Sequence, residues 1–286
     1  MKPPYQYHHY KDLPQLLKEV PNPPRGLYVR GQWPLTGATV AVVGTRGPTR
    51  EGVALARRFA KELAEQEIIV ISGLALGIDA AAHSGALDAG GKTIAVLGNG
   101  IDKIHPQTNQ RLGEKILEGG GAIVSEYPPG IPAYQDNFLQ RNRIISGLSL
   151  GVVVIEAPFR SGALVTARHA VEQNREVFVV PGPLSNHNYQ GSHRLIRSGA
   201  ALVTSIEDIC EEINLPFAPA EELARRKIKL TPEQDKIFNF VKSAGRPVNV
   251  DNIIETTKIN PSQVNQIIAF LVINDMIKES TGKYHL

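Results

Sequence analysis

The sequence has a single cysteine, few aromatic residues and no long apolar run. Cys210 is the only cysteine among 286 residues, which excludes an internal disulfide or a Cys-rich zinc site and is typical of a reducing cytoplasm. There is no run of about 18 apolar residues and no signal-peptide pattern. We therefore expect a cytoplasmic protein without a membrane span. The histidines lack metal-ligand spacing, so no metal is expected.

The sequence also has no large excess of positive or negative charge. The net charge is +3 and the isoelectric point is about 8.9. This mild basicity excludes a histone-like nucleic-acid binder. A nucleic-acid partner would require the cationic side chains to gather in one groove.

Short apolar strands alternate with helices through most of the chain, which predicts a parallel sheet covered on both faces. We expect a Rossmann-like α/β domain over residues 27–210, with an edge strand at 27–30. The other expected strands are 39–43, 68–71, 93–97, 122–124, 151–155, 176–180 and 201–203, and the expected helices are 51–66, 78–88, 107–117, 137–148, 163–173 and 192–198.

The two ends of the chain have a different character. Six prolines in residues 1–26 predict an irregular lead-in, and residues 211–229 are interpreted as a linker. Residues 230–286 predict a winged-helix-like domain of three helices and a hairpin near Gly282. Thr231 and Asn260 are expected N-caps, each followed by a Pro at the first helical position, and Val250–Thr256 is the expected short helix between them. The last helix carries no Lys or Arg, which favours protein contact or weak accessory DNA binding over sequence-specific reading.

Five glycine-bearing turns lie between an expected strand and an expected helix. They read GTRG (44–47), SGLALGID (72–79), GNGID (98–102), SGALVTA (161–167) and PGP (181–183). Such turns converge at the carboxyl edge of an open α/β sheet, and their backbone amides bind anions. The pattern predicts several phosphate-binding positions along one edge.

Two common nucleotide motifs are absent. No G-x-G-x-x-G occurs, and the second strand ends at Ser72-Gly73 without a ribose-binding carboxylate, which excludes a dinucleotide. Gly91-Lys92-Thr93 fails as a P-loop, because Ala86 stands where the first glycine is needed and the motif leads into a strand. No cofactor is expected.

A basic helix start, Arg141-Asn142-Arg143, predicts a phosphate clamp by two guanidinium groups. Phe138 could offer a ring for base stacking. The alternative is that Phe138 belongs to the core and that the arginines pair with carboxylates such as Glu126 or Glu156.

Asp79 and His83, one helical turn apart, admit several roles. Asp79 could cap its helix, orient a basic side chain or contact a ligand. A catalytic pair with His83 is conceivable, but a packed or surface histidine is the simpler interpretation.

The motifs together resemble one family. GTRG, SGLALGIDAAAH, GNGIDKIHP, SEYPPG, FLQRNRIISGLS, IEA, SGALVTARHAVEQNREVFVVPG and GSHRLIRSGA follow in this order between Leu27 and Ile209. They resemble the DprA/Smf family, the DNA-processing proteins of natural transformation. The resemblance implies an extended Rossmann fold without catalysis that binds and protects incoming single-stranded DNA, forms a homodimer and loads the RecA recombinase.

The expected single-stranded DNA site combines the motif matches with the turn and ring residues named above. It comprises Gly44, Thr45, Arg46, Ser72, Gly73, Asn99, Gly100, Phe138, Arg141, Asn142, Arg143, Ser161, Gly162 and Thr166. Several phosphate-binding turns along one edge suit a flexible strand better than one nucleotide.

The chain departs from the family pattern at several positions. Leu139 replaces the usual Pro, and Gln135 and Asp136 stand where relatives often have a basic residue, which we expect to weaken one phosphate contact. His105 replaces Tyr and His193 replaces Asn. Residues 1–26 are too short for the small N-terminal helical domain of many relatives.

The alternative function is a nucleotide-processing enzyme resembling a phosphoribohydrolase. Such an enzyme would need Glu126 and Glu156 as its carboxylates. Pro181-Gly182-Pro183 lacks the PGGxGT continuation of that class.

Overall fold

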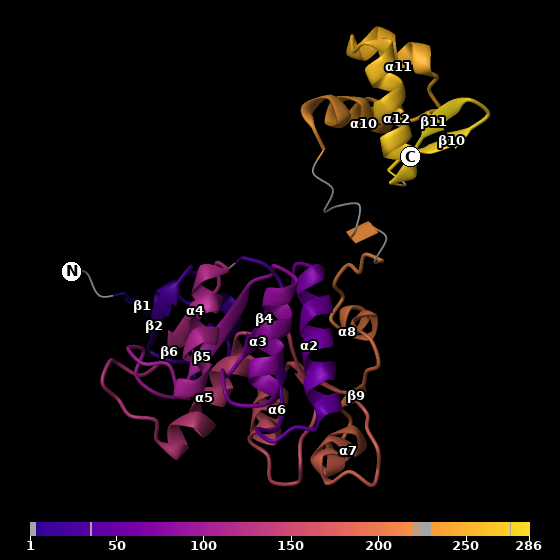
Figure 1. Ribbon diagram of the computed structural model, residues 1–286. Coiled ribbons are helices and arrows are strands. Elements are labelled where there is room, and N and C mark those ends of the chain that lie inside the picture. The colour runs from indigo at the N-terminus through magenta and orange to yellow at the C-terminus, as the bar shows by residue number, and fades with distance from the viewer. Residues whose placement is uncertain (1–3, 35, 220–221, 224–229, 275) are drawn as a thin grey trace. The chain divides into compact units, whose positions relative to one another are not determined.

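The computed structural model describes residues 4–34, 36–219, 222–223, 230–274 and 276–286. It divides into two compact units, Met1–Phe217 and Ala218–Leu286 (Figure 1). The division falls inside the expected linker of residues 211–229. Part of that linker lies outside the described residues, and its first two residues belong to a helix that ends at Glu212.

The larger unit contains a nine-stranded sheet in the order β1-β2-β6-β5-β4-β3-β7-β8-β9. All pairings from β6 to β9 are parallel, whereas β1 and β2 add antiparallel strands. This confirms the predicted α/β class with its mostly parallel sheet. The strands are β1 (Gln6–His9), β2 (Gly26–Gly31), β3 (Thr39–Val43), β4 (Ile69–Ser72), β5 (Thr93–Leu97), β6 (Ala122–Ser125), β7 (Gly151–Val154), β8 (Glu176–Val179) and β9 (Ala201–Leu202).

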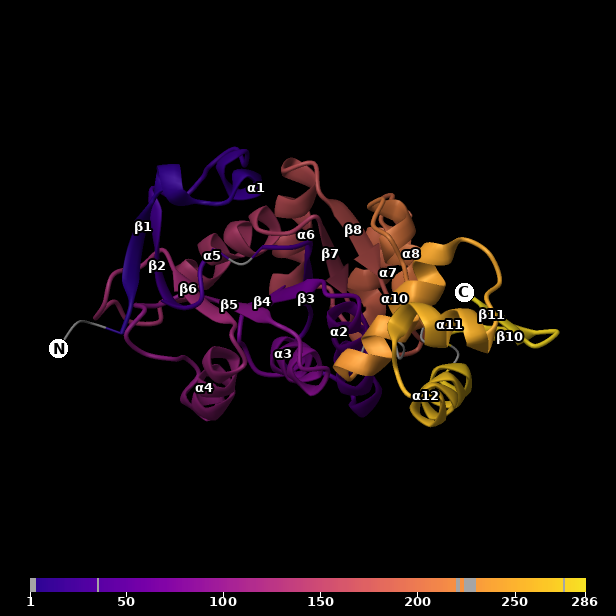
Figure 2. The same cartoon turned by 90° about the horizontal axis from the view of Figure 1, so that it is seen from above.

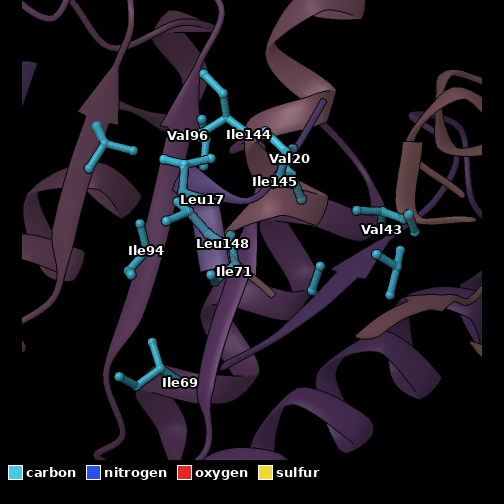
Figure 3. Packing of buried hydrophobic residues seen from close by; sticks show 14 of the residues in the cluster. Leu17, Val20, Val43, Ile69, Ile71, Ile94, Val96, Ile144, Ile145 and Leu148 are labelled. Atoms are coloured by element: carbon cyan, nitrogen blue, oxygen red, sulfur yellow. The ribbon is translucent and has the colours of Figure 1, made fainter. Parts of the chain in front are cut away.

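Helices cover both faces of this sheet, and apolar strand side chains, which alternate between the faces, pack against them on each side. Ala41 and Val43 of β3 join the core of α1, α5 and α6 (Figure 3), and Val40 and Val42 join that of α2, α3 and α8 (Figure 2). The helices are α1 (Gln15–Lys18), α2 (Arg50–Glu65), α3 (Ile78–Asp88), α4 (Gln110–Glu118), α5 (Gln135–Gly147), α6 (Gly162–Glu172), α7 (Gln190–Arg197) and α8 (Ile206–Glu212), and the 3-10 turns are η1 (Tyr10–Asp12), η2 (Gln107–Asn109) and η3 (His187–Tyr189).

The strand order reverses beside β3. The chain runs from β3 through β4 and β5 to β6 on one side and then crosses to β7 on the other. The loops after β3 and β7 therefore diverge, which leaves a crevice at the carboxyl edge, the usual ligand position in this architecture.

The expectation of an irregular lead-in over residues 1–26 was wrong. Within its described part, β1 pairs antiparallel with β2 and forms the sheet edge, so β2 is an interior strand and not the edge strand expected at 27–30. Leu17 and Val20 pack in one core with Ile144 of α5 and with Leu148, the residue directly after this helix (Figure 3). The prolines exclude a long helix but leave a short strand possible, and its pairing partner was not visible locally.

The smaller unit has three helices, a short hairpin and its own apolar core. Its elements are α10 (Pro232–Ala244), α11 (Val250–Thr257), α12 (Pro261–Ile273), β10 (Lys278–Ser280) and β11 (Lys283–His285). The predicted N-caps at Thr231 and Asn260 are confirmed, since their side chains accept the amide protons of Gln234 and Ser262. The order of elements agrees with the expected one, and the winged-helix assignment itself stays a prediction.

Candidate functional site

A pocket of about 650 Å³ opens at the carboxyl edge, where the strand order reverses. Its walls come from the loops after β3, β4 and β7 and from one face of α5. Most of the expected site residues line this pocket: Gly44, Thr45, Arg46, Phe138, Arg141, Asn142, Ser161, Gly162 and Thr166. Sequence motifs far apart in the chain thus converge on one cavity.

Arg46 and Phe138 lie beside each other in this wall. The Arg46 guanidinium lies 5.3 Å from the centroid of the Phe138 ring, a cation–π distance. Phe138 is half-buried because its ring packs on Gly98, where a Cβ would come within 2.6 Å of Cδ1. Arg46 is exposed and has no ion-pair partner in the described part of the chain. A free cation beside an aromatic face suits a phosphate next to a base.

Arg160 is a pocket residue that the sequence reasoning missed. It lies in the loop between β7 and α6, is exposed, and has no ion pair among the described residues. The available signal was its position directly before Ser161-Gly162, at the start of a helix. With Arg46 it gives the pocket two accessible guanidinium groups.

Arg141 lines the pocket, but its guanidinium is bonded inside the protein. Its side chain is only 3% exposed, and it donates to the carbonyl oxygens of Gly73, at 2.8 Å, and Val96. Burial lowers the pKa of Arg141 to about 10, and the carboxylate of Asp79 acts in the opposite direction. Arg141 is therefore still protonated at neutral pH, as a buried cation in the pocket wall.

Asp79 serves this buried cation and the turn after β4. Its Oδ2 accepts the amide protons of Gly73 at 3.1 Å and Ala75 at 3.4 Å. Burial raises the pKa of Asp79, while Arg141 and these amides oppose the increase. The hydrogen bonds recorded for Asp79 thus go to the turn after β4, and among the described residues its carboxylate acts on Arg141 through its charge, without a recorded hydrogen bond or ion pair.

Arg143 is not one of the residues that line the pocket. It donates to both carboxylate oxygens of Glu126 at 2.6 Å, as the alternative interpretation of the basic helix had it. Asn142 instead joins the helices around the pocket, since its Nδ2 donates to the carbonyl oxygen of Gly162 at 3.2 Å. The guanidinium groups of Arg141 and Arg143 are thus both bonded to partners inside the protein.

The carboxylate of Glu156 lies at the start of α2, directly after the GTRG turn. It is fully buried and accepts from the Thr49 amide at 3.0 Å, from the Thr49 hydroxyl and from Asn188 Nδ2 at 2.9 Å. The Thr45 amide donates to the Glu156 carbonyl and the Gly47 amide to Thr45 Oγ1. The amides of Thr45 and Gly47 thus have partners inside the protein, and phosphate binding at the GTRG turn stays a prediction.

The remaining expected site residues lie outside the pocket. Ser72 is buried and donates to the Val42 carbonyl, and Asn99 donates to carbonyl groups of its own turn. The Gly100 amide donates to the Ile131 carbonyl. Gly73 lies under Arg141, and a Cβ there would come within 2.5 Å of the guanidinium.

The fifth turn, PGP, is explained by packing. The PGP turn holds Gly182 against the Tyr189 ring, where a Cβ would come within 2.2 Å of Cε1. His193, the departure from the family pattern, lies 3.1 Å from the Gly182 carbonyl oxygen and stacks on Tyr189. His105 lies against Phe138, with ring centroids 5.6 Å apart.

His83 is a packed core residue, which was the simpler interpretation. It is fully buried, its Nδ1 lies 2.7 Å from Thr93 Oγ1, and burial lowers its pKa to about 3. The residues that the structure describes contain no cluster of His, Cys, Asp and Glu suited to a metal.

The fold and the pocket define a class: a doubly wound α/β protein with an arginine-bearing pocket where the strand order reverses. The model for the family described as DNA recombination-mediator protein A matches residues 5–214, and the chain belongs to this family. The resemblance seen in the sequence motifs is thereby confirmed.

The chain is similar to curated relatives over its larger unit. It is 49% identical over 212 residues to Protein Smf of Escherichia coli, covering 72% of this chain and 56% of that protein. It is 43% identical over 197 residues to DNA processing protein DprA of Streptococcus pneumoniae, covering 68% of this chain and 69% of that protein. The chain spans 50% of Protein Smf of Synechocystis, so it corresponds to about half the length of some relatives.

Solved structures agree on the fold. The X-ray structure of DprA from Streptococcus pneumoniae has a TM-score of 0.69 and 41% identity, covering 75% of each chain. DNA processing protein A from Helicobacter pylori has a TM-score of 0.64 and 32% identity, covering 73% of this chain and 95% of the other. The second structure is described as giving insight into a single-stranded DNA binding mode of that protein.

Within the described residues, no helix has both the length and the apolar character that crossing a membrane requires.

Proposed function

We propose that this protein is a non-enzymatic recombination mediator that binds single-stranded DNA in the pocket at the carboxyl edge. The observation that carries the proposal is a pair of exposed guanidinium groups in the pocket, Arg46 and Arg160, which have no ion pair among the described residues, together with the half-buried Phe138 ring beside Arg46. Cations with an aromatic face bind the backbone and bases of a single strand without requiring a particular sequence. The open pocket suits a polymer that passes through it.

The finer parts of the proposal follow from family membership. They are protection of incoming DNA during natural transformation, loading of RecA, a homodimer and a cytoplasmic location. The single-stranded DNA binding described for the Helicobacter pylori relative supports the choice of ligand.

The carboxylates of Glu126 and Glu156 are both bonded to protein groups, which favours a mediator over the nucleotide enzyme. Glu156 is enclosed by Thr49 and Asn188, and Glu126 is paired with Arg143. An enzyme using these two groups would have to break both sets of contacts before it could transfer a proton.

The test is fluorescence anisotropy with labelled oligo-dT and a matched duplex over a salt series. The variants are Arg46→Ala, Arg160→Ala and, as a control, Lys61→Ala, which removes one exposed positive charge from α2 outside the pocket. We expect wild type to prefer the single strand. Each arginine variant should lower the affinity and reduce the salt slope by about 0.7 for each lost phosphate contact.

The control should bind like wild type. Equal affinity for duplex and single strand, unaffected by either arginine variant, would contradict the proposal. Nucleotide hydrolysis by wild type that Glu156→Gln abolishes would support the enzyme instead.

A further inference from the structure

The loop between β7 and α6 points side chains in two directions. Pro158 and Arg160 line the pocket, but Phe159 between them does not. The Phe159 side chain is 55% exposed. A large aromatic ring is therefore presented to solvent directly beside the pocket.

A guanidinium group from α7 lies over this ring. The Arg194 guanidinium of α7 lies 5.5 Å from the Phe159 ring centroid. Arg194 is exposed and has no ion pair in the described part of the chain. The guanidinium covers part of the ring, and the exposed remainder is available for a second flat group.

Backbone contacts join the loop to α7 and position this pair. The amides of Gly191 and Ser192 donate to the Ala157 carbonyl oxygen at 2.8 and 3.2 Å, and the Ala157 amide donates to Ser192 Oγ at 3.1 Å. Gly191 and Ser192 are in the first turn of α7, and Arg194 follows within the next turn. Phe159 and Arg194 thus approach each other on two segments that are hydrogen-bonded together.

The pocket alone is too small for a long strand. A volume of about 650 Å³ is that of a site for one drug-sized ligand, whereas single-strand sites on other folds take roughly 4 to 16 nucleotides. A strand bound at Arg160 must continue over the surface, and Phe159 is the adjacent residue.

We propose that Phe159 and Arg194 form a second stacking platform, which receives a base of the single strand where it leaves the pocket past Arg160. This rests on the proposed function. The aromatic face would stack on the base, and Arg194, with the exposed Arg197 one turn further along α7, would contact the backbone phosphates.

The charges favour DNA over an apolar protein partner. The aromatic ring is flanked by Arg160 and Arg194, neither of which has an acidic partner among the described residues. A protein that buried Phe159 would have to desolvate or pair both cations, whereas a nucleotide supplies a base and a phosphate together.

The experiment measures anisotropy with labelled dT20 for wild type, Phe159→Ala, Phe159→Leu, Phe159→Trp and Arg194→Gln. Val171→Ala is the matched control, because it removes apolar surface that is 66% exposed on the same unit, beyond the pocket-lining turn of α6. Tryptophan emission is also recorded on addition of dT20 to Phe159→Trp and to wild type, whose only tryptophan is Trp33.

We expect Phe159→Ala and Phe159→Leu to weaken binding roughly tenfold, because both lose the aromatic face. Their salt slope should not change, since no phosphate contact is lost. Phe159→Trp should retain affinity, and dT20 should quench its emission beyond the change seen in wild type. Arg194→Gln should lower both the affinity and the salt slope.

Wild-type affinity in Phe159→Leu together with unquenched emission in Phe159→Trp would overturn the platform. So would Phe159 variants that alter self-association in sedimentation while leaving DNA affinity intact, since the surface would then contact protein. If Arg46→Ala still lowers the affinity for dT20 in those cases, the proposed function survives. Failure of wild type to bind dT20 would overturn both.

Discussion

At the scale of the residue, burial separates arginines that sequence motifs present as equivalent. Arg141 is 3% exposed and donates to backbone carbonyls, whereas Arg46 is exposed beside Phe138. A buried guanidinium already surrounded by acceptors has little capacity left for a phosphate. Arg141 is therefore part of the pocket wall, whereas Arg46 and Arg160 are the exposed arginines to which the proposed function assigns DNA contacts.

Replacing Arg141 should destabilise the protein. Arg141→Met leaves Asp79 without its cation and the Gly73 and Val96 carbonyls without donors. We expect the free energy of unfolding, measured by urea denaturation, to fall by about 3–5 kcal/mol. Arg160→Met, at an exposed site in the same pocket, should change it by no more than about 0.5 kcal/mol. Equal costs for the two variants would refute this division of roles.

At the scale of the element, the start of α2 is stabilised by a carboxylate from another segment. Thr49 caps the helix by accepting the Gly52 amide proton at 3.0 Å, and Glu156, which follows β7, accepts from Thr49. A negative charge at a helix N-terminus is favourable because the unpaired amides there carry partial positive charge. This arrangement joins α2, β7 and η3, since Asn188 also donates to Glu156.

Removing that charge should destabilise the junction of α2, β7 and η3. Glu156→Gln should lower the free energy of unfolding by about 1–3 kcal/mol, since a buried acceptor of several hydrogen bonds is replaced by a group that also donates. Glu51→Gln, in the exposed first turn of the same helix, should cost less than about 1 kcal/mol. Thermal or urea unfolding of both variants checks this, and a Glu156→Gln variant as stable as Glu51→Gln would contradict it.

At the scale of the whole molecule, the pocket and the C-terminal unit belong to separate compact bodies. Every pocket-lining residue lies within Met1–Phe217, and Ala218–Leu286 has its own core around Ile237, Val264 and Leu271. The exposed residues of α12 include Ser262, Gln263 and Asn265, and this helix contains no Lys or Arg.

A chain ending at Phe217 should therefore bind dT20 with an affinity within about twofold of the full chain, as expected for independent sites. Anisotropy titrations of both chains at the same salt concentration test this. A loss of tenfold or more would mean that the C-terminal unit contributes DNA contacts of its own.

Much of the fold followed from local patterns. Runs such as Thr39–Val43 and Gly151–Val154 are continuous and apolar because parallel strands are buried on both faces, and the N-caps at Thr231 and Asn260 were readable from short-range chemistry. The β1–β2 pairing was not, because a short proline-flanked segment becomes a strand only when a partner edge is available.

The sequence by itself determined the α/β class, the family and the convergence of the GTRG and SGALVTA turns at one edge, because these depend on periodicity and order along the chain. Only the tertiary structure decided which charges stay free. Arg143 pairs with Glu126, and Glu156 accepts a hydrogen bond from the Thr49 amide at the start of α2. Arg46 and Arg160 line the pocket and are exposed. Pairing and burial depend on distances between segments far apart in the chain, and those distances exist only once the sheet has formed.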